Sequence, residues 1–148
     1  MTGDSTNEGP SIRVGETGSR TVHLHFSEPA KPYGDDPTLD FVVRAHGRSV
    51  SIETLVRTWS GDGLDAFLSL LAKDFQGWDG ARTWRSLEGD LTLSAEHRSR
   101  GYVHLTWGIR PRPPEESWNF EITTVHAAGE DMRRLSTRFA AFFTDGIV

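Results

Sequence analysis

The segment LTLSAEHRSRGYVHLTWGI, residues 91–109, decides the fold because apolar and polar residues alternate on both sides of a turn. Such alternation predicts two paired strands, and Gly101 supplies the positive φ that a bulged turn after residues 98–100 requires. The predicted register gives three apolar pairs on one face: Leu91 with Trp107, Leu93 with Leu105 and Ala95 with Val103. Their polar neighbours share the other face. The hairpin therefore predicts a sheet with one apolar and one polar face.

The patterns on either side of this hairpin extend the sheet and add two helices. Alternation predicts further strands around residues 22–26, 82–87 and 118–123. A second hairpin, with a two-residue turn at 46–47, pairs Val43 with Val50, Phe41 with Ile52 and Leu39 with Thr54. Apolar residues at helical spacing predict amphipathic helices over about 63–74 and from Glu130 to Phe143. We therefore expect an α+β fold: a mainly antiparallel, twisted sheet of about five to six strands with both helices on one face.

Length, composition and charge place the chain in a broad class. A chain of 148 residues fits a single α+β domain, which we expect to span residues 21–148 after a mostly disordered N-terminal segment at 1–20. Cysteine is absent, so disulfides and thiolate metal sites are excluded. No apolar run is long enough to cross a membrane, and residues 1–10 lack the features of a signal peptide, so the cytoplasm is the expected location. The net charge of −5 disfavours nucleic acid and favours a cationic protein partner.

The sequence contains no motif that indicates a particular reaction. A nucleophile elbow, a phosphate-binding loop, a cysteine cluster and an HExxH helix are all missing. We therefore predict no bound cofactor. We therefore favour a non-enzymatic, protein-binding role over an enzymatic one.

The polar face of the predicted sheet is the candidate functional surface, because the helices would cover the apolar face. The polar side chains predicted to lie on this face are those of His23, His25, Ser94, Glu96, Tyr102, His104, Asn119 and Glu121. An exposed tyrosine among hydrogen-bonding and acidic groups suits a moderately polar protein interface. The residues predicted to contact a protein partner are Glu96, Tyr102, His104 and Glu121. An ordinary solvated face is the competing interpretation, since alternation places polar residues on any sheet with one open side.

Two other functions are open at this point. Neutral imidazoles two residues apart on a strand can bind one metal ion together, which suggests a metal-assisted hydrolytic site. Its predicted ligands are His23, His25, His104 and Glu121. Arginines outnumber acidic residues between positions 82 and 112, so a phosphate or another small ligand is the second alternative. The residues predicted for that role are Arg82, Arg85, Arg98 or Arg100.

The five tryptophans have different expected roles. Trp107 and Trp118 have the parity of core residues in their strands, so we assign both to packing. Trp78 lies in a glycine-flanked turn and is the tryptophan expected to be partly exposed, although covering the edge of the helix is the commoner role for such a residue. Trp59 and Trp84 have no assigned role.

Three segments resemble known families: Gly77-Trp78-Asp79-Gly80, Trp84-Arg85-Ser86-Leu87-Glu88-Gly89-Asp90-Leu91-Thr92-Leu93 and Gly101-Tyr102-Val103-His104-Leu105. Together they are similar to an uncharacterised actinobacterial family of small proteins and, more distantly, to WapI-type immunity proteins of polymorphic toxin systems. The likeness covers about residues 39–143. Both resemblances imply a helix, a hairpin, a further strand and an amphipathic helix. The first implies no activity, whereas the second implies a protein that neutralises a toxin by binding it, without defined catalytic residues.

Overall fold

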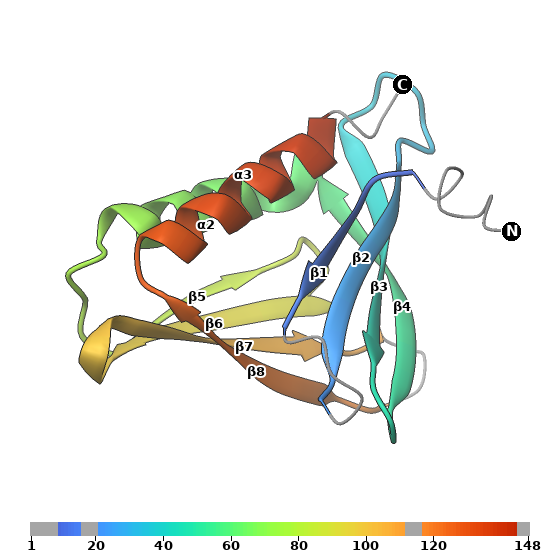
Figure 1. Cartoon of the computed structure of the whole chain (residues 1–148). Coiled ribbons are helices and arrows are strands. Elements are labelled where there is room, and N and C mark those ends of the chain that lie inside the picture. Colours follow the sequence, from blue (N-terminus) through green and yellow to red (C-terminus); the bar gives the residue numbers. More distant parts are fainter. Residues whose placement is uncertain (1–8, 16–20, 112–116, 145–148) are drawn as a thin grey trace, which may run out of the picture.

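The computed structural model describes residues 9–15, 21–111 and 117–144, which form two antiparallel sheets and two helices (Figure 1). Sheet A has the strand order β1-β2-β3-β4, and sheet B has the order β5-β6-β7-β8. The strands of sheet A are β1 (Ser11–Val14), β2 (His23–Ala30), β3 (Thr38–His46) and β4 (Ser51–Trp59). Those of sheet B are β5 (Ala81–Arg85), β6 (Leu91–Arg98), β7 (Tyr102–Ile109) and β8 (Phe120–Ala127). The helices are α2 (Leu64–Lys73) and α3 (Glu130–Thr144), and the short 3-10 turns are η1 (Ser60–Gly63) and η2 (Ser99–Gly101).

The α+β class is confirmed, but the prediction of a single sheet of about five to six strands is wrong. The chain leaves sheet A at Trp59 and passes through η1 and α2 before it starts β5, and the later strands pair only with one another. Sheet A stands at an angle to sheet B, and both helices lie over the same side of sheet B (Figure 1). Apolar alternation does not reveal this division, because residues of both sheets face one core.

Aromatic rings join the two sheets to α3. The centroid of the Phe139 ring on α3 lies 5.0 Å from that of Phe26 on β2 and 6.4 Å from that of Trp107 on β7. The rings of Phe26 and Trp107 are 5.6 Å apart, and all three side chains are fully buried. Burial of large aromatic side chains is a main source of domain stability. The centre of the core is therefore the place where β2, β7 and α3 meet.

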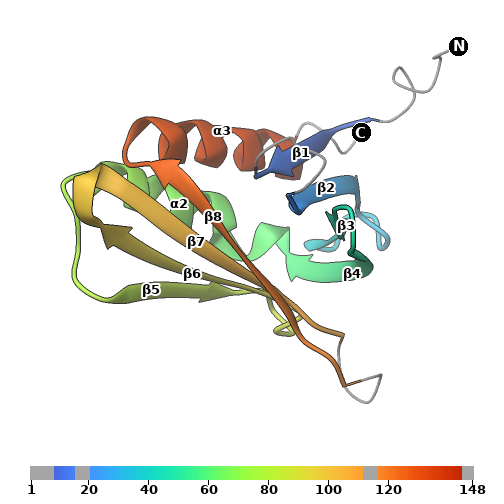
Figure 2. The same cartoon turned by 60° about the horizontal axis from the view of Figure 1, so that its bottom comes forward.

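Both predicted helices are confirmed, with α2 at Leu64–Lys73 and α3 beginning at Glu130. They run side by side in both views (Figures 1 and 2). The hydroxyl of Ser136 on α3 donates to the carbonyl of Asp65 on α2 at 2.8 Å, which links the two helices directly. No helix in the described ranges is both long enough and apolar enough to span a bilayer.

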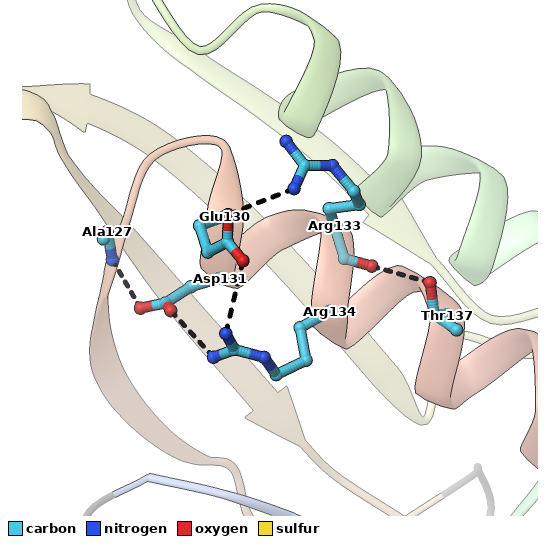
Figure 3. Close-up of polar contacts among 6 residues, drawn as sticks. All are labelled: Ala127, Glu130, Asp131, Arg133, Arg134 and Thr137. Atoms are coloured by element: carbon cyan, nitrogen blue, oxygen red, sulfur yellow. Dashed lines mark hydrogen bonds and ion pairs between the residues drawn. The ribbon is translucent and has the colours of Figure 1, made fainter.

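The first turn of α3 is held by polar contacts (Figure 3). The Asp131 carboxylate accepts a hydrogen bond from the amide of Ala127, the last residue of β8, at 2.7 Å. Glu130 and Asp131 also pair with Arg133 and Arg134 at distances between 3.2 and 3.4 Å. Negative charge is favourable at a helix N-terminus, because the helix dipole is positive there. The hydrogen bond from Ala127 to Asp131 ties the start of the helix to the end of the strand that precedes it, and the ion pairs brace the first turn itself.

The hairpin of β6 and β7 forms in a register that differs from the predicted one by two residues. Leu91 pairs with Ile109, Leu93 with Trp107 and Ala95 with Leu105. This register places Gly108 opposite Thr92, where a Cβ at position 108 would overlap the threonine hydroxyl. The position therefore suits glycine. Because the shift is even, every side chain keeps its predicted face.

The hairpin of β3 and β4 was also predicted in the wrong register, by four residues. Phe41 pairs with Val56, and residues 47–50 replace the predicted two-residue turn. The observed register brings Asp40 opposite Arg57, whose guanidinium makes two 2.9 Å hydrogen bonds to the carboxylate. Asp40 is buried, so this charge-assisted pair compensates a carboxylate that would otherwise lack a partner. The shift is again even, and the predicted faces are kept.

Ordered structure begins before the predicted boundary at residue 21, because Ser11–Val14 forms β1 beside β2. Both apolar residues of this strand are buried, so it belongs to the core. The prediction of a mostly disordered segment at 1–20 is therefore wrong for β1. Residues 1–8 and 16–20 lie outside the described part of the chain.

Candidate functional site

The face of sheet B that points away from the helices carries the residues predicted to bind a partner. We call it the outer face of sheet B, and it consists of Ala81, Thr83, Arg85, Thr92, Ser94, Glu96, Arg98, Tyr102, His104, Thr106, Gly108, Glu121, Thr123, Val125 and Ala127. Their neighbours along β6 and β7 are mostly buried in the core, so alternation turns these side chains outward. Both helices lie on the opposite side of the sheet, and no described element covers this face (Figure 2).

Three of the four predicted partner-binding residues lie together on this face. Glu96 on β6 is directly opposite His104 on β7, and Tyr102 lies two residues from His104 on the same strand. Tyr102 is 47 % exposed, and Val125, which is opposite His104 on β8, is 55 % exposed. The Arg98 guanidinium donates to the Glu96 carboxylate at 2.8 Å. We call these five residues the Tyr102 cluster.

Glu121, the fourth predicted residue, lies apart from the cluster. It is opposite Gly108, which is four residues along β7 from His104. At roughly 3.3 Å per residue, the two positions on β7 are about 13 Å apart. A row of hydroxyl side chains crosses the sheet between them, formed by Thr83, Ser94, Thr106 and Thr123. These small side chains make the middle of the face flat, so Glu121 belongs to a separate part of it.

The predicted metal ligands are not brought together. His23 and His25 lie on β2 in sheet A, whereas His104 and Glu121 lie on β7 and β8 in sheet B. Zinc ligands bind at about 2.0–2.2 Å, so the ligands of one ion must converge closely. Within the described ranges, no three His, Asp or Glu side chains are placed to hold one metal ion. The geometry therefore gives no support to a metal-assisted hydrolytic site at these four residues.

His23 and His25 instead line a hollow on the outer side of sheet A, which we call the histidine hollow. It has a volume of about 630 Å³ and is lined by Ser11, Arg13, His23, His25, Ser27, Glu28, Arg44 and His46. The rings of His23 and His46 lie 5.8 Å apart. Burial lowers the pKa of His23 from its usual value, and the charge of Arg13 lowers it further.

Sequence reasoning missed several members of the histidine hollow, among them His46 and Arg13. His46 was assigned to a turn, although it is the last residue of β3. Arg13 was assigned to the disordered segment, although the alternating run SIRV at residues 11–14 is the signal of a strand. Correct assignment of both strands would have placed the three histidines and Arg13 on one face.

The four arginines predicted to bind phosphate do not form one site. Arg82 pairs with Asp74 at 2.6 Å, and Arg98 belongs to the Tyr102 cluster. Arg85 ends β5, whereas Arg100 lies in η2 at the opposite end of β6. The four arginines therefore do not converge on a single point, and a phosphate site at any one of them stays a prediction.

Trp59, to which the sequence assigned no role, is 58 % exposed. Trp107 is fully buried and Trp118 packs against the core, as predicted. Trp78 is partly exposed, as predicted, and its indole N–H donates to the carbonyl of Ala95 at 3.2 Å. Trp59 is the last residue of β4 and has outward parity, so extending the predicted strand would have indicated its exposure.

The sheets, helices and surfaces define a two-sheet α+β domain. The model of a family of unknown function, DUF6228, matches residues 15–146 of the chain. The protein belongs to this family. This match confirms the prediction that the chain belongs to a family of unknown function. Comparisons with curated proteins and with solved structures give no match.

Proposed function

We propose that this protein acts by binding another protein through the outer face of sheet B, with the Tyr102 cluster at the centre of the contact. The exposed tyrosine supports this proposal most directly, because Tyr102 and Val125 present apolar area on a face that no described element covers. Tyrosine combines a large apolar ring with a polar end and is enriched among the residues that contribute most to binding.

The dimensions of the face suit a small interface. Three strand spacings of about 4.8 Å give a width of about 14 Å, and strands of eight residues give a length of about 26 Å. A stable interface commonly buries about 800 Å² on each partner, which is more than this flat rectangle alone provides. In this proposal the neighbouring η2 turn extends the contact area, because it directly precedes Tyr102.

The charge of the chain supports a partner with a basic surface. The net charge of the chain is −5. On the outer face of sheet B, Glu96 and Glu121 lie with Arg85 and Arg98, so the preference for a basic partner rests on the charge of the whole chain. Complementary charge accelerates association and suppresses wrong partners. Occlusion of a toxin-like protein is the narrower form of this proposal, and it is based on the resemblance to WapI-type immunity proteins.

Comparative affinity capture tests the proposal. Tagged wild type, Tyr102→Ala and Tyr33→Ala are used to capture proteins from a lysate of the native cells, and quantitative mass spectrometry measures the amounts. Tyr33 is the matched control, because it is also exposed but lies between β2 and β3 of sheet A. We expect one protein at near-equal abundance with wild type and Tyr33→Ala. Removal of a central tyrosine costs about 2 kcal/mol, so Tyr102→Ala weakens binding roughly 30-fold.

A charge-reversing variant distinguishes a loss of binding at the proposed face from a general loss of stability. Glu96→Arg is expected to reduce capture of a basic partner while leaving the melting temperature within a few degrees of wild type, because Glu96 is only partly buried. Equal capture of the same partner by every variant would refute the proposed face. Elution of the wild type alone would refute the protein-binding role itself.

A further inference from the structure

The histidine hollow gathers basic side chains from three strands of sheet A. The register places Arg13 opposite His25 and His25 opposite Arg44, so these residues form one row across β1, β2 and β3. His23 is opposite His46 in the adjacent row. Neighbouring strands are about 4.8 Å apart, so the five side chains project from a small area. Such a concentration of basic groups contrasts with the net negative charge of the chain.

Two buried polar atoms at the hollow have no hydrogen-bond partner among the described residues. They are the hydroxyl oxygen of Ser27, a residue that is 5 % exposed, and Nδ1 of His23. Buried polar atoms are nearly always hydrogen-bonded, so an unpaired one calls for an explanation. Both residues line the hollow, which means that a ligand bound there can supply the missing partners.

The arginines of the hollow differ in how far their charges are compensated. Arg44 pairs with Glu53 on β4 at 2.6 Å, and Glu28 approaches it at 3.8 Å from the rim of the hollow. Glu28 has a φ of 57°, a conformation that a residue other than glycine rarely adopts. Within the described ranges, no ion pair or hydrogen bond compensates the guanidinium of Arg13. Arg13 is therefore the charge available to a ligand.

We propose that the histidine hollow binds a phosphate group, with Arg13 as its charged contact and Ser27 and His23 as hydrogen-bonding contacts. A phosphate group offers several acceptor oxygens and carries about −1.5 to −2 charges at pH 7, which suits donors that converge from different strands. The Ser27 hydroxyl and the N–H of a neutral imidazole are both donors to such oxygens. In this arrangement the phosphate competes with Glu28 for Arg44. The site lies on sheet A and does not depend on the partner-binding face of sheet B.

An NMR titration of the full chain with inorganic phosphate tests this site. The imidazole signals are followed at pH 7 while sodium chloride keeps the ionic strength constant. We expect saturable shifts of the His23 and His46 signals. The groups around His23 are Arg13 on β1, His25 on β2, and Arg44 and His46 on β3, with Glu28 at the rim. A bound phosphate adds negative charge to this setting, so saturation raises the pKa of His23.

Three variants are expected to change the phosphate affinity in different ways: one weakens it, one strengthens it and one leaves it unchanged. Arg13→Gln weakens binding about tenfold, because it removes the uncompensated charge. Glu28→Gln strengthens binding severalfold, because it removes the internal competitor; a purely structural role would not produce a gain. Arg100→Gln, in η2 of sheet B, is the control and leaves the affinity unchanged.

A second ligand, O-phosphoserine, identifies the source of the phosphate group. Equal affinity for both ligands supports recognition of the phosphate alone, and tighter binding of O-phosphoserine supports recognition of a phosphate ester. The proposal is overturned if neither ligand produces saturable shifts. Equal affinity of Arg13→Gln and wild type for phosphate would overturn it as well.

Discussion

Replacement of Phe139 by alanine is expected to destabilise the whole domain, because this ring joins α3 to both sheets. Phe139 is fully buried between Phe26 and Trp107, and its removal leaves a cavity at the centre of the core. Core substitutions of phenylalanine by alanine cost about 3–5 kcal/mol. For a domain of this size, each kcal/mol lowers the melting temperature by about 2–4 °C. A loss of about 4 kcal/mol therefore corresponds to a decrease of about 8–16 °C.

Urea and thermal unfolding followed by circular dichroism measure this effect. Phe75→Ala is the matched control, because Phe75 follows α2 and is mostly exposed. Surface substitutions usually change stability by no more than about 0.5 kcal/mol, so the control is expected to unfold close to wild type. If Phe139→Ala were no less stable than Phe75→Ala, Phe139 would not be what joins α3 to the two sheets.

Two further predictions concern the register of sheet B and the pH dependence of stability. Gly108→Ala is expected to cost about 1–3 kcal/mol through overlap with Thr92, and Thr92→Ala should restore part of the loss in urea unfolding. No recovery in the double variant would contradict the observed register. Burial lowers the pKa of His126, whose Nε2 lies 2.7 Å from the Thr124 hydroxyl. The folded state therefore binds fewer protons than the unfolded state just below pH 6.5, so stability should fall as the pH decreases from about 6.5. This decrease should be smaller in His126→Gln, and an unchanged pH profile in that variant would argue against the assignment.

The sequence predicts the faces of the strands better than their partners. Leu93 and Trp107 were both assigned to the core, and both are buried, although the predicted register did not pair them. An error of two or four residues preserves the parity of every position, so alternation cannot detect it. Local packing decides the register instead. The fit of Gly108 against Thr92 depends on the distance between two strands, and strand composition does not specify this distance.

The alternation of apolar and polar residues also could not predict that the strands divide into two sheets. His23 and His104 share outward parity, which suggested one polar face, but they lie on different sheets. The two sheets meet where Phe26 and Trp107 pack around α3. These residues are far apart in the sequence, so no local sequence pattern predicts their contact. The candidate surface was predicted where it depends on a single hairpin, as for Glu96, Tyr102 and His104 on β6 and β7. It was not predicted where residues from distant strands meet, as in the histidine hollow.

Photo-crosslinking in native cells tests the partner-binding role of the outer face of sheet B most directly. p-Benzoylphenylalanine is placed at position 102 in one variant and at position 33, in sheet A's β2–β3 connection, in the other. We expect one dominant covalent adduct with a basic protein at position 102 and none with that protein at position 33. Adducts of the same protein at both positions, or no specific adduct at position 102, would contradict it.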